Sequence, residues 1–294
     1  MEDVAWQGGV AAIFTLAADE VTTYQLPRPY CMVLPRQSLL PFVTEGVHSH
    51  FKPHGPPMGS EIWFEANGEP LRWQIPIGVL FDLLNAADAV TLPWRITVHL
   101  QAFPADAVLR STRQEAESVL LNALKESCVL RCGSAMPAMT LSPSSQQALG
   151  DALAAPRSDL SAARAGCAAI GELIENAVRT QLAGQATDGD VGATPPSRAV
   201  PLRVFTSATA WRQQPLPPLQ PDGQPSLLRD ALALLLPAHF DAAGSEASGG
   251  VGGGRPAPLV IVQGVVVPLN TPLQWLWESC HHPDGWLYVT VRVS

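Results

Sequence analysis

The chain has 294 residues, of which 47% are hydrophobic and 15% charged, and its formal net charge at pH 7 is -8. This composition is typical of a globular protein with two or three domains and excludes a disordered chain. The acidic balance argues against a nucleic-acid-binding protein and against a polybasic membrane anchor. No run approaches the length of about 18 apolar residues that a transmembrane helix needs, and no basic segment leads into an apolar run at the N-terminus.

The five cysteines are odd in number, widely scattered and contain no Cys-x-x-Cys pair. They are Cys31, Cys128, Cys132, Cys167 and Cys280. This spacing is typical of reduced thiols in an intracellular protein and not of a disulfide framework. We therefore expect a soluble protein of the cytosol or nucleus.

Lysine is rarer still, since Lys52 and Lys125 stand against sixteen arginines. Arginine supplies positive charge, but a side-chain amine that can be acylated comes only from lysine. Lys125 lies in a run that reads as an amphipathic helix, and Lys52 lies beside a proline-rich loop. Codon bias explains the scarcity of lysine but not where the two lysines lie.

Residues 1–110 combine short strand patterns with two helical patterns. Runs rich in β-branched and aromatic residues predict strands at 13–16, 30–34, 61–65, 70–73 and 94–100. The apolar spacing predicts helices at 38–51 and 77–84. Asn67-Gly68 lies between two of the strands, where Asn-Gly is a strong hairpin signal. The predicted order is strand, strand, helix, strand, strand, helix, strand.

Residues 111–183 are rich in Ala, Leu, Gln and Glu and predict helices at 114–128 and 159–182. Proline breaks the stretch between them, at Pro137, Pro143 and Pro156. On the first helix, Lys125 shares the polar side with Glu115, Ser118 and Asn122. Residues 184–198 offer little to bury and read as a linker.

Residues 199–294 repeat the order of elements in the first region. Strands are predicted at 200–205, 259–262, 265–269 and 286–291, with an edge strand near Trp211. Helices are predicted at 226–236, with Ser226 as N-cap, and from Thr271, with Thr271 as N-cap. The Gly/Ser/Ala-rich insert at 241–258 predicts a flexible loop.

Two copies of this element order predict an α+β protein with two ubiquitin-like β-grasp domains flanking a helix-rich domain. The predicted boundaries are 1–110 for the N-terminal segment and first ubiquitin-like domain, 111–183 for the helix-rich domain and 184–198 for the linker. The second ubiquitin-like domain then covers 199–294, with the flexible insert at 241–258.

Several long motifs resemble the autophagy protein 5 family. In chain order they are Glu61-Ile62-Trp63-Phe64-Glu65, Pro76-Ile77-Gly78-Val79-Leu80-Phe81-Asp82-Leu83-Leu84, Leu92-Pro93-Trp94-Arg95-Ile96-Thr97-Val98-His99 and Thr271-Pro272-Leu273-Gln274-Trp275-Leu276. Pro201-Leu202-Arg203-Val204 also matches in kind. The motifs follow the family's order over nearly the whole chain. The resemblance implies two ubiquitin-like domains around a helix-rich one, in agreement with the fold predicted from pattern.

The resemblance also implies a function. In this family the modifier autophagy protein 12, itself ubiquitin-like, is joined through its C-terminal glycine to one lysine of a Lys-Glu pair, the position of Lys125-Glu126 here. Autophagy protein 16 binds non-covalently, as a helix in a groove. The conjugate acts in a ligase-like way to promote lipidation of autophagy protein 8 during autophagosome formation. E2-like conjugating enzymes are transient partners, and the implied location is the cytoplasm, with peripheral recruitment to the preautophagosomal (phagophore) membrane.

An acceptor lysine needs reach and exposure, because the conjugating enzyme's site removes the proton that a lysine amine carries near neutral pH. Successive side chains on a helix diverge by about 100°. We therefore interpret Glu126 as a neighbour of Lys125 and not as its base.

The competing signals are weaker. Cys280-His281-His282 could suggest a nucleophile or metal ligands, but adjacent side chains diverge and no further ligands are evident. His48, His50 and His54 have no acidic or thiol partner in the sequence. We expect no catalytic residue, no cofactor, no metal and no nucleic acid partner. The alternatives to a conjugation scaffold are an unconjugated ubiquitin-like adaptor, expected if Lys125 is buried or unused, and a thiol hydrolase that uses Cys280.

Five tryptophans fall in predicted strands or helices, where packing in the core is the expected role. They are Trp63, Trp73, Trp94, Trp275 and Trp286. Aromatic residues are also enriched at protein interfaces, so some of these could line the implied groove for autophagy protein 16.

Overall fold

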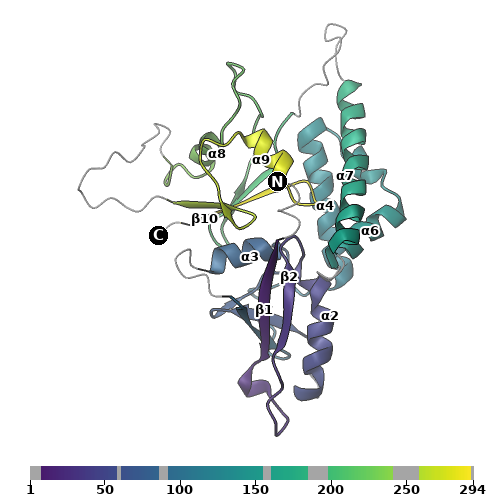
Figure 1. Ribbon diagram of the computed structural model, residues 1–294, viewed down its shortest axis with the longest axis vertical. Coiled ribbons are helices and arrows are strands. Elements are labelled where there is room, and N and C mark those ends of the chain that lie inside the picture. The colour runs from purple at the N-terminus through teal and green to yellow at the C-terminus, as the bar shows by residue number, and fades with distance from the viewer. Residues whose placement is uncertain are drawn as a thin grey trace, which may run out of the picture. The chain divides into compact units, whose positions relative to one another are not determined.

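The computed structural model describes residues 8–57, 61–85, 92–154, 160–184, 198–240 and 258–292. The chain forms two compact units, one with residues 6–120 and 144–167, the other with residues 121–143 and 168–294 (Figure 1). Most of the predicted linker at 184–198 and of the insert at 241–258 falls outside the described residues.

In the described part of the first region, the sheet has five strands. They are β1 (Gly9–Leu16), β2 (Tyr30–Pro35), β3 (Trp63–Ala66), β4 (Glu69–Pro70) and β5 (Trp94–His99). Their order is β2-β1-β5-β3-β4, and β1 and β5 are parallel while the other neighbours are antiparallel. Helices α2 (Leu40–Phe51) and α3 (Ile77–Leu84) belong to this unit, with short 3-10 turns η1 (Ala18–Glu20) and η2 (Lys52–His54). The predicted Asn67-Gly68 turn closes the β3–β4 hairpin, with φ of 54° and 81°.

Every second side chain of β1 contributes to the core of this unit. Val10, Ala12, Phe14 and Leu16 point to one face and are buried. From α2, Val47 and Phe51 are also fully buried, and Figure 1 shows this helix running beside β1 and β2.

The second sheet repeats this topology. Its strands are β6 (Leu202–Phe205), β7 (Trp211–Gln213), β8 (Leu259–Val262), β9 (Val265–Val266) and β10 (Leu287–Arg292). Their order is β7-β6-β10-β8-β9, again with the first and last strands, β6 and β10, parallel. Helices α8 (Leu228–Leu235) and α9 (Leu273–Cys280) complete the unit's β-grasp element order. The prediction of two ubiquitin-like domains is confirmed, and β7 lies at the sheet edge as predicted.

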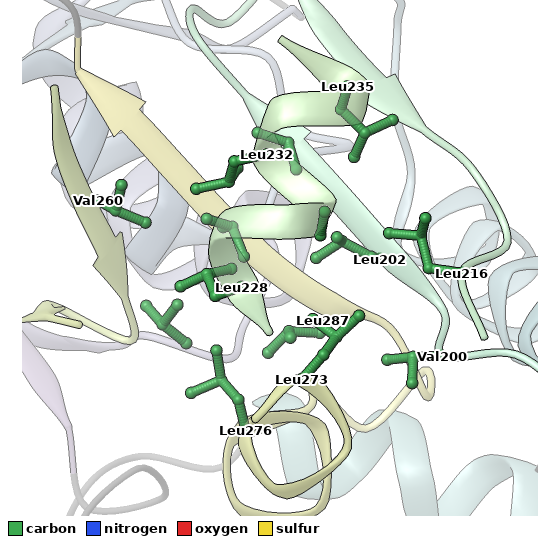
Figure 2. Close-up of a cluster of buried hydrophobic side chains, with 14 of the residues drawn as sticks. Val200, Leu202, Leu216, Leu228, Leu232, Leu235, Val260, Leu273, Leu276 and Leu287 are labelled. Carbon is green, nitrogen blue, oxygen red and sulfur yellow. The ribbon is translucent and has the colours of Figure 1, made fainter. Parts of the chain in front are cut away.

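The core of the second domain lies between the sheet and α8 (Figure 2). Leu228, Leu232 and Leu235 point from α8 toward the sheet, where Leu202 of β6 and Leu287 of β10 are fully buried. Burying a leucine side chain contributes about 1.5–3 kcal/mol, so the 3.6-residue spacing of these leucines fixes which face of α8 packs inward.

Among the residues that the structure describes, the helix-rich region contains four helices where the sequence predicted two. They are α4 (Arg113–Cys132), α5 (Met136–Met139), α6 (Pro143–Ala154) and α7 (Leu160–Ala183). The helical stretch is interrupted at Pro137 and Pro143, as predicted, and these prolines lie in the first turns of α5 and α6, while Pro156 falls outside the described residues. Proline is tolerated there because the first N–H groups of a helix have no partner within it. None of the described helices has the length and apolar character needed to cross a membrane.

Both predicted N-caps in the second domain are one residue early. The N-cap of α8 is Leu227, whose N–H donates to Oδ2 of Asp230 at 3.0 Å, and not Ser226. The N-cap of α9 is Pro272, while the Thr271 hydroxyl donates back to the carbonyl of Pro268 at 2.7 Å. In α8 the acceptor is the side chain of Asp230 in the first turn, so Ser226 before the helix does not act as the N-cap.

Candidate functional site

Lys125 lies in the middle of α4, on the side that faces solvent. Its neighbours Asn122, Glu126 and Val129 are exposed, whereas Leu124 and Ser127 are buried. Lys125 itself is half-buried, and its Nζ lies 3.5 Å from Oδ1 of Asn122. Within the described part of the chain, Lys125 forms no ion pair. The amine is therefore accessible, as an acceptor requires.

The opposite side of this turn of α4 contacts the second ubiquitin-like domain. The indole N–H of Trp286, which is 1% exposed, donates to the backbone carbonyl of Ala123 at 2.9 Å. Gly285 has φ of +81°, and a Cβ atom there would overlap the hydroxyl of Ser127. Ala123 and Ser127 lie about 160° and 200° around the helix from Lys125. The Lys125 side chain therefore points away from the face of α4 that packs on the domain.

Arg203 of β6 holds the next residue of the helix. Its guanidinium donates to Oε2 of Glu126 at 2.8 Å, to the hydroxyl of Tyr288 at 3.2 Å and to Oε1 of Gln213 at 3.0 Å. It also lies 3.9 Å from the centre of the Trp286 ring, within the range of a cation–π contact. The Arg203 side chain is only 17% exposed. The Glu126 carboxylate is thus paired with Arg203.

A buried polar chain continues from Arg203 into the domain. The Tyr288 hydroxyl donates to Oδ2 of Asp284 at 2.7 Å, and Oδ1 of Asp284 lies 3.0 Å from Nδ1 of His282. Burial alone would raise the pKa of Asp284, but the charge and hydrogen bond of His282 and the charge of Arg203 hold that pKa below its usual range. Burial and the Asp284 carboxylate raise the pKa of Tyr288 well above its ordinary value, so its phenol stays a donor. These groups form one connected network from Glu126 to His282.

Lys52 has different surroundings. It is exposed in η2, directly after α2, in the unit that holds the first sheet. Burial, and then the charge of Lys52, lower the pKa of His48 on the preceding turn. Both lysine amines are accessible, so exposure alone does not choose between them. Lys125 differs from Lys52 in lying on a helix of the helix-rich region whose opposite side contacts the second ubiquitin-like domain, through Trp286 and Gly285.

Cys280, His281 and His282 do not converge. Cys280 is half-buried, and burial raises the pKa of its thiol, the opposite of what a nucleophilic cysteine needs. The ring of His281 stacks on Trp277, and His282 pairs with Asp284. His50 and His54 contact the carbonyl of Arg28 and the hydroxyl of Thr23. Among the residues that the structure describes, no three His, Cys, Asp or Glu side chains are grouped as metal ligands.

The tryptophans divide between core and surface. Trp73, Trp94 and Trp286 are buried as expected, but Trp275 is 42% exposed and that expectation was wrong. Trp277, two residues further along α9, is buried instead, because two helical residues turn the side chain by about 200°. In the first domain, Trp63 and Trp73 line a cavity of about 280 Å³ beside α2.

Sequence reasoning missed the role of Arg203 and its partners. The signal available was alternation: Leu202 and Val204 point into the core, so Arg203 belongs on the other face of β6. A charged residue on that face normally contacts solvent. Its contact with α4 joins residues 77 positions apart, and the Trp286–Ala123 hydrogen bond joins residues 163 apart.

Comparison with known proteins gives a consistent family. Three domain models of autophagy protein ATG5 match, the UblA domain at residues 5–100, the alpha-helical bundle region at 113–157 and the UblB domain at 199–291. The chain is 27% identical to autophagy protein 5 of Aspergillus fumigatus over 100% of this chain and 95% of that protein. It is 28% identical to autophagy protein 5 of Drosophila melanogaster over 97% of this chain and 94% of that protein.

A solved structure has the same fold. The crystal structure of Kluyveromyces marxianus Atg5 superposes with a TM-score of 0.73 at 20% sequence identity, covering 98% of each chain. The family's three domain models match in order around the two β-grasp sheets, so this chain belongs to the autophagy protein 5 family and has a role in autophagy.

Proposed function

We propose that this protein is a conjugation scaffold that accepts the ubiquitin-like modifier autophagy protein 12 through an isopeptide bond at Lys125. The observation that carries the proposal is the placement of Lys125. Its amine lies on the open side of α4, while the opposite side of the same turn contacts the second ubiquitin-like domain through Trp286 and Gly285. We call residues 122–127 of α4 the acceptor turn.

The proposed reaction needs no catalytic group from this chain. The amine of Lys125 attacks the carbonyl carbon of the modifier's C-terminal glycine, which arrives as a thioester on an E2-like enzyme. A C–N bond forms, the C–S bond breaks, and the enzyme's cysteine leaves as a thiol. Of the two protons that the ammonium group loses, one ends on that thiol and one in solvent. This chain contributes the position of the amine, and proximity is a large term in such transfers.

The further steps rest on family membership. We propose that the conjugate binds autophagy protein 16, promotes lipidation of autophagy protein 8 in a ligase-like way, and is recruited from the cytoplasm to the phagophore membrane. A concave surface lined by aromatic side chains is the kind of surface that binds an apolar helix. We propose that the cavity of about 280 Å³ lined by Trp63 and Trp73 in the first domain receives a side chain of that helix.

The test compares the two lysines. We expect Lys125→Arg to abolish the slowly migrating conjugate on an immunoblot from cells, because arginine keeps the charge but its guanidinium is not acylated. Lys52→Arg is the matched control and should leave the conjugate at wild-type level. A conjugate that survives Lys125→Arg would contradict the proposal.

Two other measurements separate the alternative functions. The intact mass of the protein purified from its own cells should include the modifier. An unmodified mass, with partners still bound, would instead indicate an unconjugated adaptor. Labelling of Cys280 by an active-site-directed thiol probe would indicate a thiol hydrolase, a result that the raised pKa of this thiol argues against.

A further inference from the structure

We infer that Arg203 is a positioning residue for conjugation: through Glu126, and together with Trp286, it holds the acceptor turn so that the Lys125 amine is presented in one orientation. The inference rests on the proposed function of Lys125. It concerns a residue 78 positions further along the chain, on a strand of the second ubiquitin-like domain.

Three contacts fix the acceptor turn, and all come from the same small region of that domain. Trp286 binds the Ala123 carbonyl, Gly285 allows Ser127 to approach, and Arg203 pairs with Glu126. A carbonyl in the middle of a helix already accepts a bond from within the helix, so the indole N–H is an additional, tertiary bond. The first two contacts set how closely the helix approaches, while the Arg203–Glu126 pair acts at the side of the helix next to Lys125.

Arg203 is itself held rigidly. Its guanidinium donates to Gln213, Tyr288 and Glu126 at the same time, and its flat face lies on Trp286. Tyr288 is fixed in turn by Asp284, and Asp284 by His282. A planar guanidinium with several fixed donors can position a carboxylate in a way that a flexible ammonium group cannot. The Glu126 side chain is 56% exposed, so without Arg203 it would be free to take other rotamers.

Rotation of the acceptor turn would change where the amine points. Glu126 lies about 100° around the helix from Lys125, so its pairing with β6 resists rotation of the amine toward or away from the sheet. Small displacements matter for a transfer reaction, because a shift of about 1 Å can cost about 100-fold in rate. We expect the conjugating enzyme to approach Lys125 from the open side of α4, so that Arg203 acts through Glu126 and contacts neither the enzyme nor the thioester.

The experiment uses the full-length chain as acceptor and the modifier preloaded as a thioester on its E2-like enzyme, with rates measured over a range of acceptor concentrations up to saturation. We expect Arg203→Gln and Glu126→Ala each to lower kcat about ten-fold, with KM within about two-fold of wild type. The double variant should be no slower than the slower single variant, since both remove one interaction. Glu126→Gln should keep most of the rate, because its amide oxygen still accepts the bond from Arg203.

These variants distinguish positioning from direct chemistry. If Glu126 acted as a base, Glu126→Gln would be as slow as Glu126→Ala, the rate loss would depend on pH, and Arg203→Gln would have little effect; that pattern would overturn the inference. So would effects of Arg203→Gln and Glu126→Ala that multiply in the double variant.

Two controls complete the design. Arg110→Gln removes the same charge from an ion pair with Glu61 in the first domain and should leave kcat unchanged. Glu126→Ala changes an exposed helix residue and is expected to fold even if Arg203→Gln does not. If Lys125→Arg abolishes the product while Glu126→Ala and Arg203→Gln react at the wild-type rate, the proposed function stands and only the positioning role fails. If Lys125→Arg still forms product, the proposed function fails first.

Discussion

The two ubiquitin-like domains share one strand order, but an arginine of each makes different contacts. In the first, Arg36 pairs with Asp82 of α3, donates to the carbonyl of Gly78 and lies over the Phe81 ring, so its contacts stay within the domain. In the second, Arg203 contacts Tyr288 and Gln213 of its own domain but also Glu126 of α4. The same strand topology therefore accommodates an arginine that pairs only within its own domain and an arginine that also pairs with a neighbouring helix.

The largest effect is expected in the first domain. Asp82→Ala leaves the Arg36 guanidinium buried without its carboxylate, which costs about 3–5 kcal/mol of unfolding free energy. Hydrogen–deuterium exchange of the β1 and β5 amides measures this loss locally. Conjugate formation at Lys125 should continue at the wild-type rate under conditions where the domain stays folded.

A double variant provides the control for this prediction. Asp82→Ala with Arg36→Met removes both charges and should recover most of the lost stability, because the cost comes from the unpaired charge. A loss below about 1 kcal/mol in Asp82→Ala would contradict the assignment of a buried ion pair. A slower conjugation rate would break the distinction between the two domains.

A smaller effect is expected from Trp286→Phe in the second domain. Phenylalanine keeps an aromatic face for Arg203 but removes the N–H that donates to Ala123, and the loss of this one hydrogen bond costs about 0.5–1.5 kcal/mol. Urea unfolding measures the loss. Unlike Asp82→Ala, this variant should also slow conjugation at Lys125. A variant that loses stability but conjugates at the wild-type rate would show that the indole hydrogen bond does not position the acceptor turn.

Features that depend on neighbouring residues in the sequence could be predicted, whereas contacts between distant segments could not. The periodicity of apolar residues identified the strands and most helices, and the hairpin at Asn67-Gly68 followed from turn chemistry, since both residues have positive φ. The polar side of α4, with Lys125, followed from the 3.6-residue period. The domain boundaries remain a prediction.

Tertiary contacts were not accessible in this way. Pro137 and Pro143 were correctly predicted as breaks, but the sequence did not show that α5 and α6 begin at these prolines. Trp275 and Trp277 are equally apolar in sequence, and only packing of α9 decides which is buried. The Arg203–Glu126 pair joins segments far apart in the chain, and alternation along β6 says only that Arg203 leaves the core.

The smallest effect is expected in the pH dependence of stability that Asp284 contributes to the second domain. The pKa of Asp284 lies below its usual range in the folded protein, so its carboxylate contributes stability at pH values above the ordinary carboxyl pKa, and that contribution is lost as the pH falls through the folded-state pKa. Asp284→Asn removes the charge that pairs with His282, so its deficit in unfolding free energy should be larger at pH 6 than at pH 3. Urea unfolding at both values checks this. A deficit that does not change with pH would mean that the Asp284 carboxylate is not stabilised by His282 and Arg203, and the polar chain behind Glu126 would then rest on the Tyr288 hydrogen bond alone.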